Sequence, residues 1–141
     1  MVHLIKLAVG IRDAAQLRDL QARRAQMSPP LRHQTRMLPK RREDILGGGS
    51  IYWVIAGYVS VRQRILDIRE ERWEDGTPCA ALVLDPLLVP VAARPVKPFQ
   101  GWRYLAAADA PPDLAPEPVA ARGVEALPEA LRRELRALCL L

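Results

Sequence analysis

The sequence predicts an α+β protein: a small, mostly antiparallel β-barrel with an N-terminal helix, a short basic helix and a C-terminal helix. A length of 141 residues suits one domain, and a hydrophobic fraction of 50% is enough for a core. Strand-like segments follow one another in the middle of the chain, without the crossovers of about a dozen residues that parallel pairing needs. Five or six such strands tend to curl into a barrel whose open ends are covered by helices.

The N-terminal part predicts a strand, a helix, a short strand and a second helix. HLIKLAVG alternates between two faces and predicts a strand over 3–10. Asp13 is a good N-cap for a helix over 14–26, which an SPP triplet ends. LRHQTRML predicts a short strand over 31–38. Pro39 then stands at the first turn of a short basic helix, and a triple glycine ends that helix in a sharp turn.

The centre of the chain predicts buried strands. SIYWVIAG (50–57) is almost entirely apolar, which predicts burial on both faces of a sheet. In YVSVRQRILDIRE (58–70) the apolar positions change parity, and a bulge near Leu66 explains the change. The AG pair between these segments suits either a hairpin or one bent continuous strand. CAALVLDP (79–86), after a DG turn, predicts another buried strand.

The C-terminal part predicts an edge, a last strand, an arm and a helix. Residues 87–95 are extended but contain Pro90, so they form an edge strand or a loop. GWRYL is the last strand of a barrel core that spans 1–105. The Ala- and Pro-rich segment 106–126 predicts an arm or linker over the surface, and the leucine stripe of 127–141 predicts a helix. The whole chain therefore reads as a single domain.

The composition indicates a basic, soluble, cytoplasmic protein. Residues 1–64 carry 12 Lys/Arg and 4 Asp/Glu, which is +8, whereas residues 65–141 carry 9 and 12, which is −3. Of these cations 18 are Arg and 3 are Lys, which suits phosphate recognition but also arises from a GC-rich genome. No signal peptide and no apolar run of about 18 residues is visible, so we expect no membrane contact.

No catalytic or metal-binding motif is visible. Cys79 and Cys139 lie in apolar runs, as expected of small buried side chains in a reducing compartment. His3 and His33 have no metal-ligand spacing, and we assign them no role. The sequence therefore predicts no metal and no cofactor, and it does not specify an oligomeric state.

The segment RPVKPFQGWRYL (94–105) gathers aromatic and basic residues. The chain has only three Trp, three Tyr and one Phe, and three of these seven fall within six positions here. Trp102 and Tyr104 share one face of an extended chain and either stack a base or plug the barrel. Gln100 is suited to reading a base edge. The cations between the rings are Arg94, Lys97 and Arg103.

A second group of cations falls within eleven residues. Such a cluster neutralises phosphates with salt-dependent affinity, or it is a solvated face with local partners such as Glu43 and Asp44. Its members are Arg32, Arg36, Lys40, Arg41 and Arg42.

Two further arginines lie on one strand. Arg62 and Arg64 project to one side and Gln63 to the other. Adjacent like charges on a sheet repel each other, so the pair needs an anion. That anion is an internal carboxylate, Asp67 or Asp85, or an external phosphate. Alternatively, Asp85, between a strand and a proline, caps a turn.

Three segments together resemble a known family. They are HLIKLAVG, TRMLPKRREDILGGGSIYWVIAGYVSVRQRIL and PFQGWRYL, and they are similar to the bacterial domain-of-unknown-function family numbered 1489. The resemblance spans residues 1 to about 114 and implies no activity. The architecture is also similar, more distantly, to the PUA and ASCH group of small β-barrels. That likeness implies RNA binding, and for some members action on modified nucleosides.

The leading functional prediction is a nucleic-acid-binding module for RNA, with an arginine-rich cleft and an aromatic stacking segment. Its candidate residues are Arg36, Lys40, Arg41, Arg42, Arg62, Arg64, Lys97, Gln100, Trp102, Arg103 and Tyr104. One alternative is a small hydrolase acting on a modified nucleoside or base, with Lys40, Glu43 and Thr35 as catalytic candidates. Another is a protein-interaction module that uses the C-terminal helix.

Overall fold

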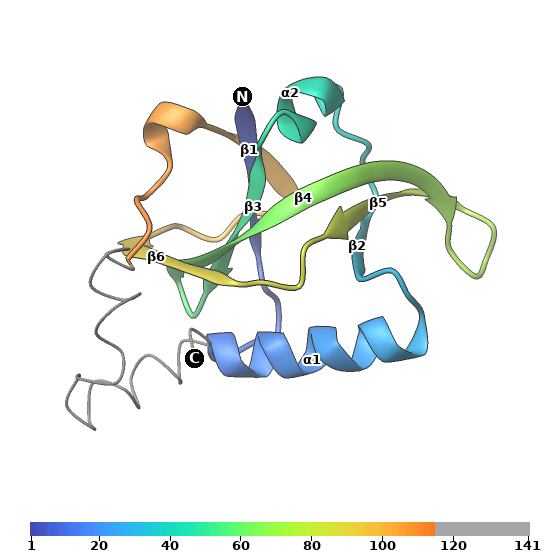
Figure 1. Ribbon diagram of the computed structural model, residues 1–141, viewed down its shortest axis with the longest axis horizontal. Coiled ribbons are helices and arrows are strands. Elements are labelled where there is room, and N and C mark those ends of the chain that lie inside the picture. Colours follow the sequence, from blue (N-terminus) through green and yellow to red (C-terminus); the bar gives the residue numbers. More distant parts are fainter. Residues whose placement is uncertain (115–141) are drawn as a thin grey trace.

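The computed structural model describes residues 1–114 (Figure 1). The predicted C-terminal helix and residues 115–126 of the predicted arm lie outside this range. In chain order the elements are β1 (Val2–Leu7), α1 (Ala14–Met27), β2 (Arg32–Thr35), α2 (Arg42–Leu46), β3 (Ser50–Ile55), β4 (Tyr58–Arg72), β5 (Pro78–Leu84), β6 (Val89–Pro95), β7 (Trp102–Ala106) and a 3-10 turn (Ala107–Asp109).

The seven strands form one mixed sheet. Its order is β2-β5-β4-β3-β1-β7, and β6 pairs with β4 beside β5. All pairs are antiparallel except β1 with β3, which are parallel because α1, β2 and α2 intervene between them. The predicted α+β class with a mostly antiparallel sheet is therefore confirmed.

The sheet is strongly curled, although no ladder closes it within the described residues. In a flat sheet the three strand spacings from β2 to β3 span roughly 14 Å, and the five from β2 to β7 roughly 24 Å. Yet the rings of His33 on β2 and Trp53 on β3 are 5.2 Å apart. Trp102 Nε1 on β7 donates to the Met37 carbonyl, two residues beyond β2, over 2.9 Å. Side-chain contacts therefore connect the β7 edge with the loop that follows the β2 edge. The sequence had predicted that the sheet closes here into a barrel.

The central hairpin follows the sequence prediction closely. Every residue of β3 is buried, because its two faces contact two separate hydrophobic clusters. Ala56 and Gly57 both have positive φ (52° and 87°), which is the type I′ geometry of a two-residue hairpin. The β4–β5 register shifts between Ile65 and Asp67, which leaves Leu66 as an exposed bulge residue.

The two helices lie at opposite ends of the curled sheet (Figure 1). The Asp13 carboxylate accepts from the backbone N–H of Gln16 (2.8 Å), so the predicted N-cap of α1 is confirmed. Leu17 of α1 and Ile45 of α2 are buried in the same cluster. No helix in the described range is long and apolar enough to cross a membrane.

The described part of the arm packs against β6, which is an edge strand as the position of Pro90 predicted. Asp113 forms an isolated bridge with Val91, and the Ala92 N–H donates to the Pro112 carbonyl (2.9 Å). Asp113 is thereby brought to the outer surface of the sheet, close to Arg62.

Candidate nucleic-acid interface

Trp102 and Tyr104 on β7 hold the loop after β2. The Tyr104 hydroxyl accepts from the backbone N–H groups of Lys40 (2.9 Å) and Arg41 (3.1 Å). The two aromatic rings meet edge to face, with centroids 5.0 Å apart. Folding therefore brings the aromatic segment beside the basic loop, and the polar atoms of both rings hold that loop. Tyr104 is 38% exposed and Trp102 is half-buried.

Replacing Tyr104 with phenylalanine tests this contact. We expect the free energy of unfolding to fall by about 1 kcal/mol, because two backbone N–H groups lose their acceptor while the ring is kept. Chemical denaturation measures the change. Tyr58→Phe is the matched control, because that exposed hydroxyl makes no hydrogen bond with residues 1–114. Equal effects of the two substitutions would contradict the assignment.

Three of the predicted phosphate-binding arginines have carboxylate partners. Arg41 pairs with Asp44 (3.1 Å) and also lies over the Tyr104 ring (5.6 Å to its centroid). Arg42 Nη2 contacts Asp67 (3.0 Å). These contacts correspond to the alternative that the sequence left open, a basic surface with local acidic partners.

Arg62 has the most complete pairing. Both oxygens of Asp113 accept from its guanidinium, at 2.7 and 2.8 Å, and the Ser50 hydroxyl accepts a third bond (3.1 Å). The hydrogen bond from Arg62 lowers the pKa of Asp113, and the same bond raises the pKa of Arg62. The sequence had suggested Asp67 or Asp85 for this role.

Those two aspartates have other partners. Asp67 accepts from Arg42 and Arg69, both at 3.0 Å. Asp85 accepts from the backbone N–H of Leu87 (2.9 Å), so it caps a turn, as one of the two sequence alternatives proposed. The true partner of Arg62 was missed because Asp113 lies 51 residues away in a segment without a strand pattern.

The remaining candidates are exposed and do not converge on one hollow. Arg103 lies over the Phe99 ring, 4.6 Å from its centroid. Arg36 lines an open groove of about 460 Å³, which Glu70, Glu71 and Arg72 also line. The others, all exposed, are Lys40, Arg64, Lys97 and Gln100.

The catalytic candidates do not form a constellation. Thr35 is buried on β2, whereas Lys40 and Glu43 are exposed. Within residues 1–114 no ion pair or hydrogen bond joins the Lys40 ammonium to Glu43 or Thr35. The geometry therefore favours no reaction at these residues.

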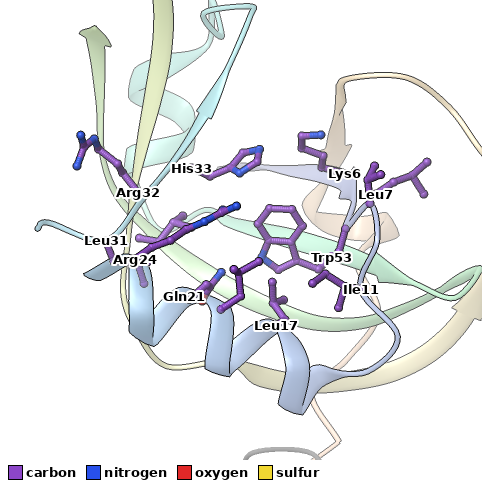
Figure 2. A pocket seen from close by; sticks show the side chains of 14 residues that line it. Lys6, Leu7, Ile11, Leu17, Gln21, Arg24, Leu31, Arg32, His33 and Trp53 are labelled. Atoms are coloured by element: carbon purple, nitrogen blue, oxygen red, sulfur yellow. The ribbon is translucent and has the colours of Figure 1, made fainter. Parts of the chain in front are cut away.

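A different cation-rich hollow lies between α1 and the sheet (Figure 2). We call it the inner chamber: a cavity of about 140 Å³ lined by Lys6, Leu17, Gln21, Arg24, His33 and Trp53, among others. Lys6 is the ladder neighbour of both Trp53 and Trp102, so these three side chains share one face of the sheet. In Figure 2, Arg24 and Lys6 approach His33 and the indole of Trp53 from different sides.

The inner chamber adjoins a wider groove on the surface. This outer groove, about 490 Å³, shares Arg24, Arg32 and His33 with the chamber and adds the ring of Trp73. We call the two hollows together the α1 cleft. Within the described residues, its lining includes three cations and no carboxylate. Of these three cations, Arg32 has an ion pair in the described residues, with Glu71 (2.9 Å).

A buried amide network fixes the tryptophan wall of the chamber. The Gln63 side chain accepts from Trp53 Nε1 (3.1 Å) and Gln21 Nε2 (2.9 Å). It donates to Gln21 Oε1 (2.7 Å) and to the Asp85 carbonyl (2.8 Å). Trp53 is 3% exposed, so only a small part of its ring borders the chamber, and its N–H is already bonded.

His33 is the polar group that this network leaves free. Its Nε2 is buried and has no hydrogen-bond partner among residues 1–114. Burial, followed by the charges of Lys6 and Arg24, lowers the pKa of His33 to about 4, so the ring is neutral near pH 7. A buried unpartnered nitrogen is unusual and suggests a binding role.

The sequence interpretation missed these residues, although weak signals were present. Lys6 has the parity of the buried Leu4, and a cation on the inner face of a strand is unusual. Arg24 follows Leu17 and Gln21 at helical spacing and so belongs to the inner face of α1. His33 gave no signal, because its proximity to Trp53 depends on the curl of the sheet.

The comparisons with known proteins identify a family but no activity. A family model described as "Protein of unknown function (DUF1489)" matches residues 4–141, a longer span than the resemblance found in the sequence. Neither the curated proteins nor the solved structures include a match. In the part of the chain that the structure covers, no group of three or more His, Cys, Asp or Glu side chains is placed to hold a metal ion.

Proposed function

We propose that this protein, which belongs to the DUF1489 family of unknown function, binds RNA with unpaired bases in the α1 cleft. One observation carries the proposal: the two adjoining hollows have three cations, two tryptophan rings and no carboxylate among their described lining residues. Cations attract the phosphate backbone, and the half-buried ring of Trp73 stacks a base with little dependence on sequence, whereas Trp53 is 3% exposed and belongs to the buried wall. Bases that are free to enter a hollow are typical of RNA loops and bulges.

The proposal keeps the predicted class of partner and moves its main site. The arginines 41, 42 and 62 already have carboxylate partners, so a phosphate must compete with Asp44, Asp67 and Asp113 for them. In contrast, Lys6 and Arg24 have no ion pair within residues 1–114. The exposed cations Arg36, Lys40 and Arg64 serve as weaker contacts for RNA that extends beyond the cleft.

Arg24→Gln tests the site. We expect it to weaken binding of a labelled single-stranded RNA of about ten nucleotides by roughly tenfold, because one phosphate contact is lost. The slope of log K against log salt should fall by about one unit between roughly 50 and 200 mM salt. Fluorescence anisotropy of the full chain measures both quantities.

Arg23→Gln is the matched control, because Arg23 is exposed on the same helix, adjacent in sequence and outside the cleft lining. It removes the same charge and should lower the affinity by less than about threefold. Absence of RNA binding at about 50 mM salt would refute the proposed function. Equal losses from the two substitutions would refute the location. DNA of the same sequence shows whether the cleft distinguishes the 2′-hydroxyl.

A further inference from the structure

The inner chamber has the size of a single aromatic ring. Its volume is about 140 Å³, and cavities of roughly 150 Å³ in proteins admit a benzene-sized molecule. The walls are the Trp53 ring and apolar side chains that include Leu17, Leu31 and Leu84. A flat, uncharged ring therefore fits, and a fused two-ring purine would extend into the outer groove.

The chamber also offers one free polar contact at its wall. The Trp53 N–H and the Gln21 amide are bonded to Gln63. His33 lines the same space, and its Nε2, which is buried, has no partner among the described residues. A neutral imidazole nitrogen either donates or accepts, depending on its tautomer. An occupant with a ring nitrogen or carbonyl satisfies this atom once the imidazole turns it toward the chamber, whereas a hydrocarbon does not.

The charges at the chamber favour an anion near the ring. Lys6 is half-buried, and burial lowers its pKa. Neither Lys6 nor Arg24 has an ion pair within residues 1–114. Figure 2 shows both side chains directed toward the region of His33 and Trp53. A phosphate attached to the bound ring places its charge between them, where it pairs with the half-buried ammonium of Lys6 and the exposed guanidinium of Arg24.

We propose that the α1 cleft binds one pyrimidine nucleoside monophosphate unit, with the base in the inner chamber beside Trp53 and His33 and the phosphate between Lys6 and Arg24. The inference rests on the proposed function where the unit is an extruded nucleotide of RNA. The same chemistry also describes free uridine or cytidine monophosphate, and the experiments separate the two sources.

The first experiment follows the three tryptophan side-chain N–H signals of the ¹⁵N-labelled full chain by NMR. The signals are assigned with Trp53→Phe, Trp73→Phe and Trp102→Phe. Uridine monophosphate is expected to shift the Trp53 signal at concentrations roughly tenfold lower than uridine or inorganic phosphate alone, because both halves of the ligand contribute. Adenosine monophosphate should bind about tenfold more weakly. The Trp102 N–H, bonded to the Met37 carbonyl, serves as the internal reference.

The second experiment separates binding from stability. His33→Phe should weaken the binding of uridine monophosphate at least about tenfold. It should leave the thermal unfolding temperature unchanged or raise it, because it removes a buried nitrogen without a partner. Lys6→Met keeps the length of the side chain. It should weaken the binding of uridine monophosphate but leave the affinity for uridine unchanged. Arg23→Gln should leave both ligands unchanged. A loss of stability in His33→Phe, together with unchanged ligand affinity, would contradict the assignment.

The third experiment compares an RNA that has one uridine bulge with the same RNA lacking that base. The intact bulge should bind about tenfold more tightly.

If both RNAs bind equally and the monophosphate leaves the Trp53 signal unshifted, the inference is wrong and the proposed function stands. If neither RNA binds but uridine monophosphate does, the proposed function is wrong and the chamber is a mononucleotide site. If inorganic phosphate equals uridine monophosphate, base recognition is refuted.

Discussion

Replacing Gly49 with alanine is expected to lower the free energy of unfolding by about 3 kcal/mol. A Cβ at this position would overlap the backbone carbonyl oxygens of Val2 and Ile45. Backbone cannot move aside as a flexible side chain can, so β1 and α2 would have to separate from the turn before β3. The Gly49 N–H and carbonyl are also bonded, to Ile45 and Ile65 respectively.

Chemical denaturation of the full chain measures this change, with Gly47→Ala as the matched control. A Cβ on Gly47 would lie 3.5 Å from the Glu43 carbonyl oxygen and 3.6 Å from that of Asp44, which is ordinary contact. Its φ of −73° also suits alanine. Gly47→Ala is expected to change stability by less than about 1 kcal/mol. Similar losses at the two positions would show that backbone freedom, and not the close approach, requires the glycine.

Replacing Gln63 with leucine is expected to cost about 3 kcal/mol of folding stability. Gln63 is 0% exposed, and its removal leaves Trp53 Nε1, the Gln21 amide and the Asp85 carbonyl without partners. Each buried polar group that loses its partner costs roughly 1–3 kcal/mol, which the added apolar contact only partly offsets. Thermal and chemical unfolding measure the loss.

The double variant Gln21→Leu, Gln63→Leu identifies the cause. It removes both amides together, so its destabilisation should be smaller than the sum of the two single losses. Strict additivity would mean that the two amides do not stabilise each other. The same network fixes the Trp53 ring. Gln63→Leu should therefore also broaden the NMR signal of the Trp53 side-chain N–H in the titration with uridine monophosphate.

Local patterns explain why much of the fold was predictable. The Asp13 cap, the apolar β3 and the bulge at Leu66 each depend on neighbours in the chain or on burial that alternation reveals. The parallel pairing of β1 with β3 was not predictable in this way, because it depends on how α1, β2 and α2 are arranged between them. The curvature of the sheet was also not predictable, because it produces no periodic pattern of residues in the sequence.

The candidate site was predicted less well than the fold, for a physical reason. The sequence shows where cations are, but pairing depends on partners that folding brings close, such as Asp113 for Arg62. The sequence also shows aromatic residues without their orientation. Trp102 and Tyr104 bond a loop, and Trp53, which is buried in the core as predicted, also borders the inner chamber.

The sequence alone determined the order of strands and helices, the family, and the excess of cations in the N-terminal half. Each of these follows from the local spacing of residues and from composition. Only the tertiary structure decided which cations remain unpaired and which rings face a hollow. The curl of the sheet places His33 beside Trp53, with Lys6 and Arg24 lining the same chamber, across strands that a flat sheet would hold apart. Distances between residues far apart in the chain are set by that curl, and they decide the charge and shape of the α1 cleft.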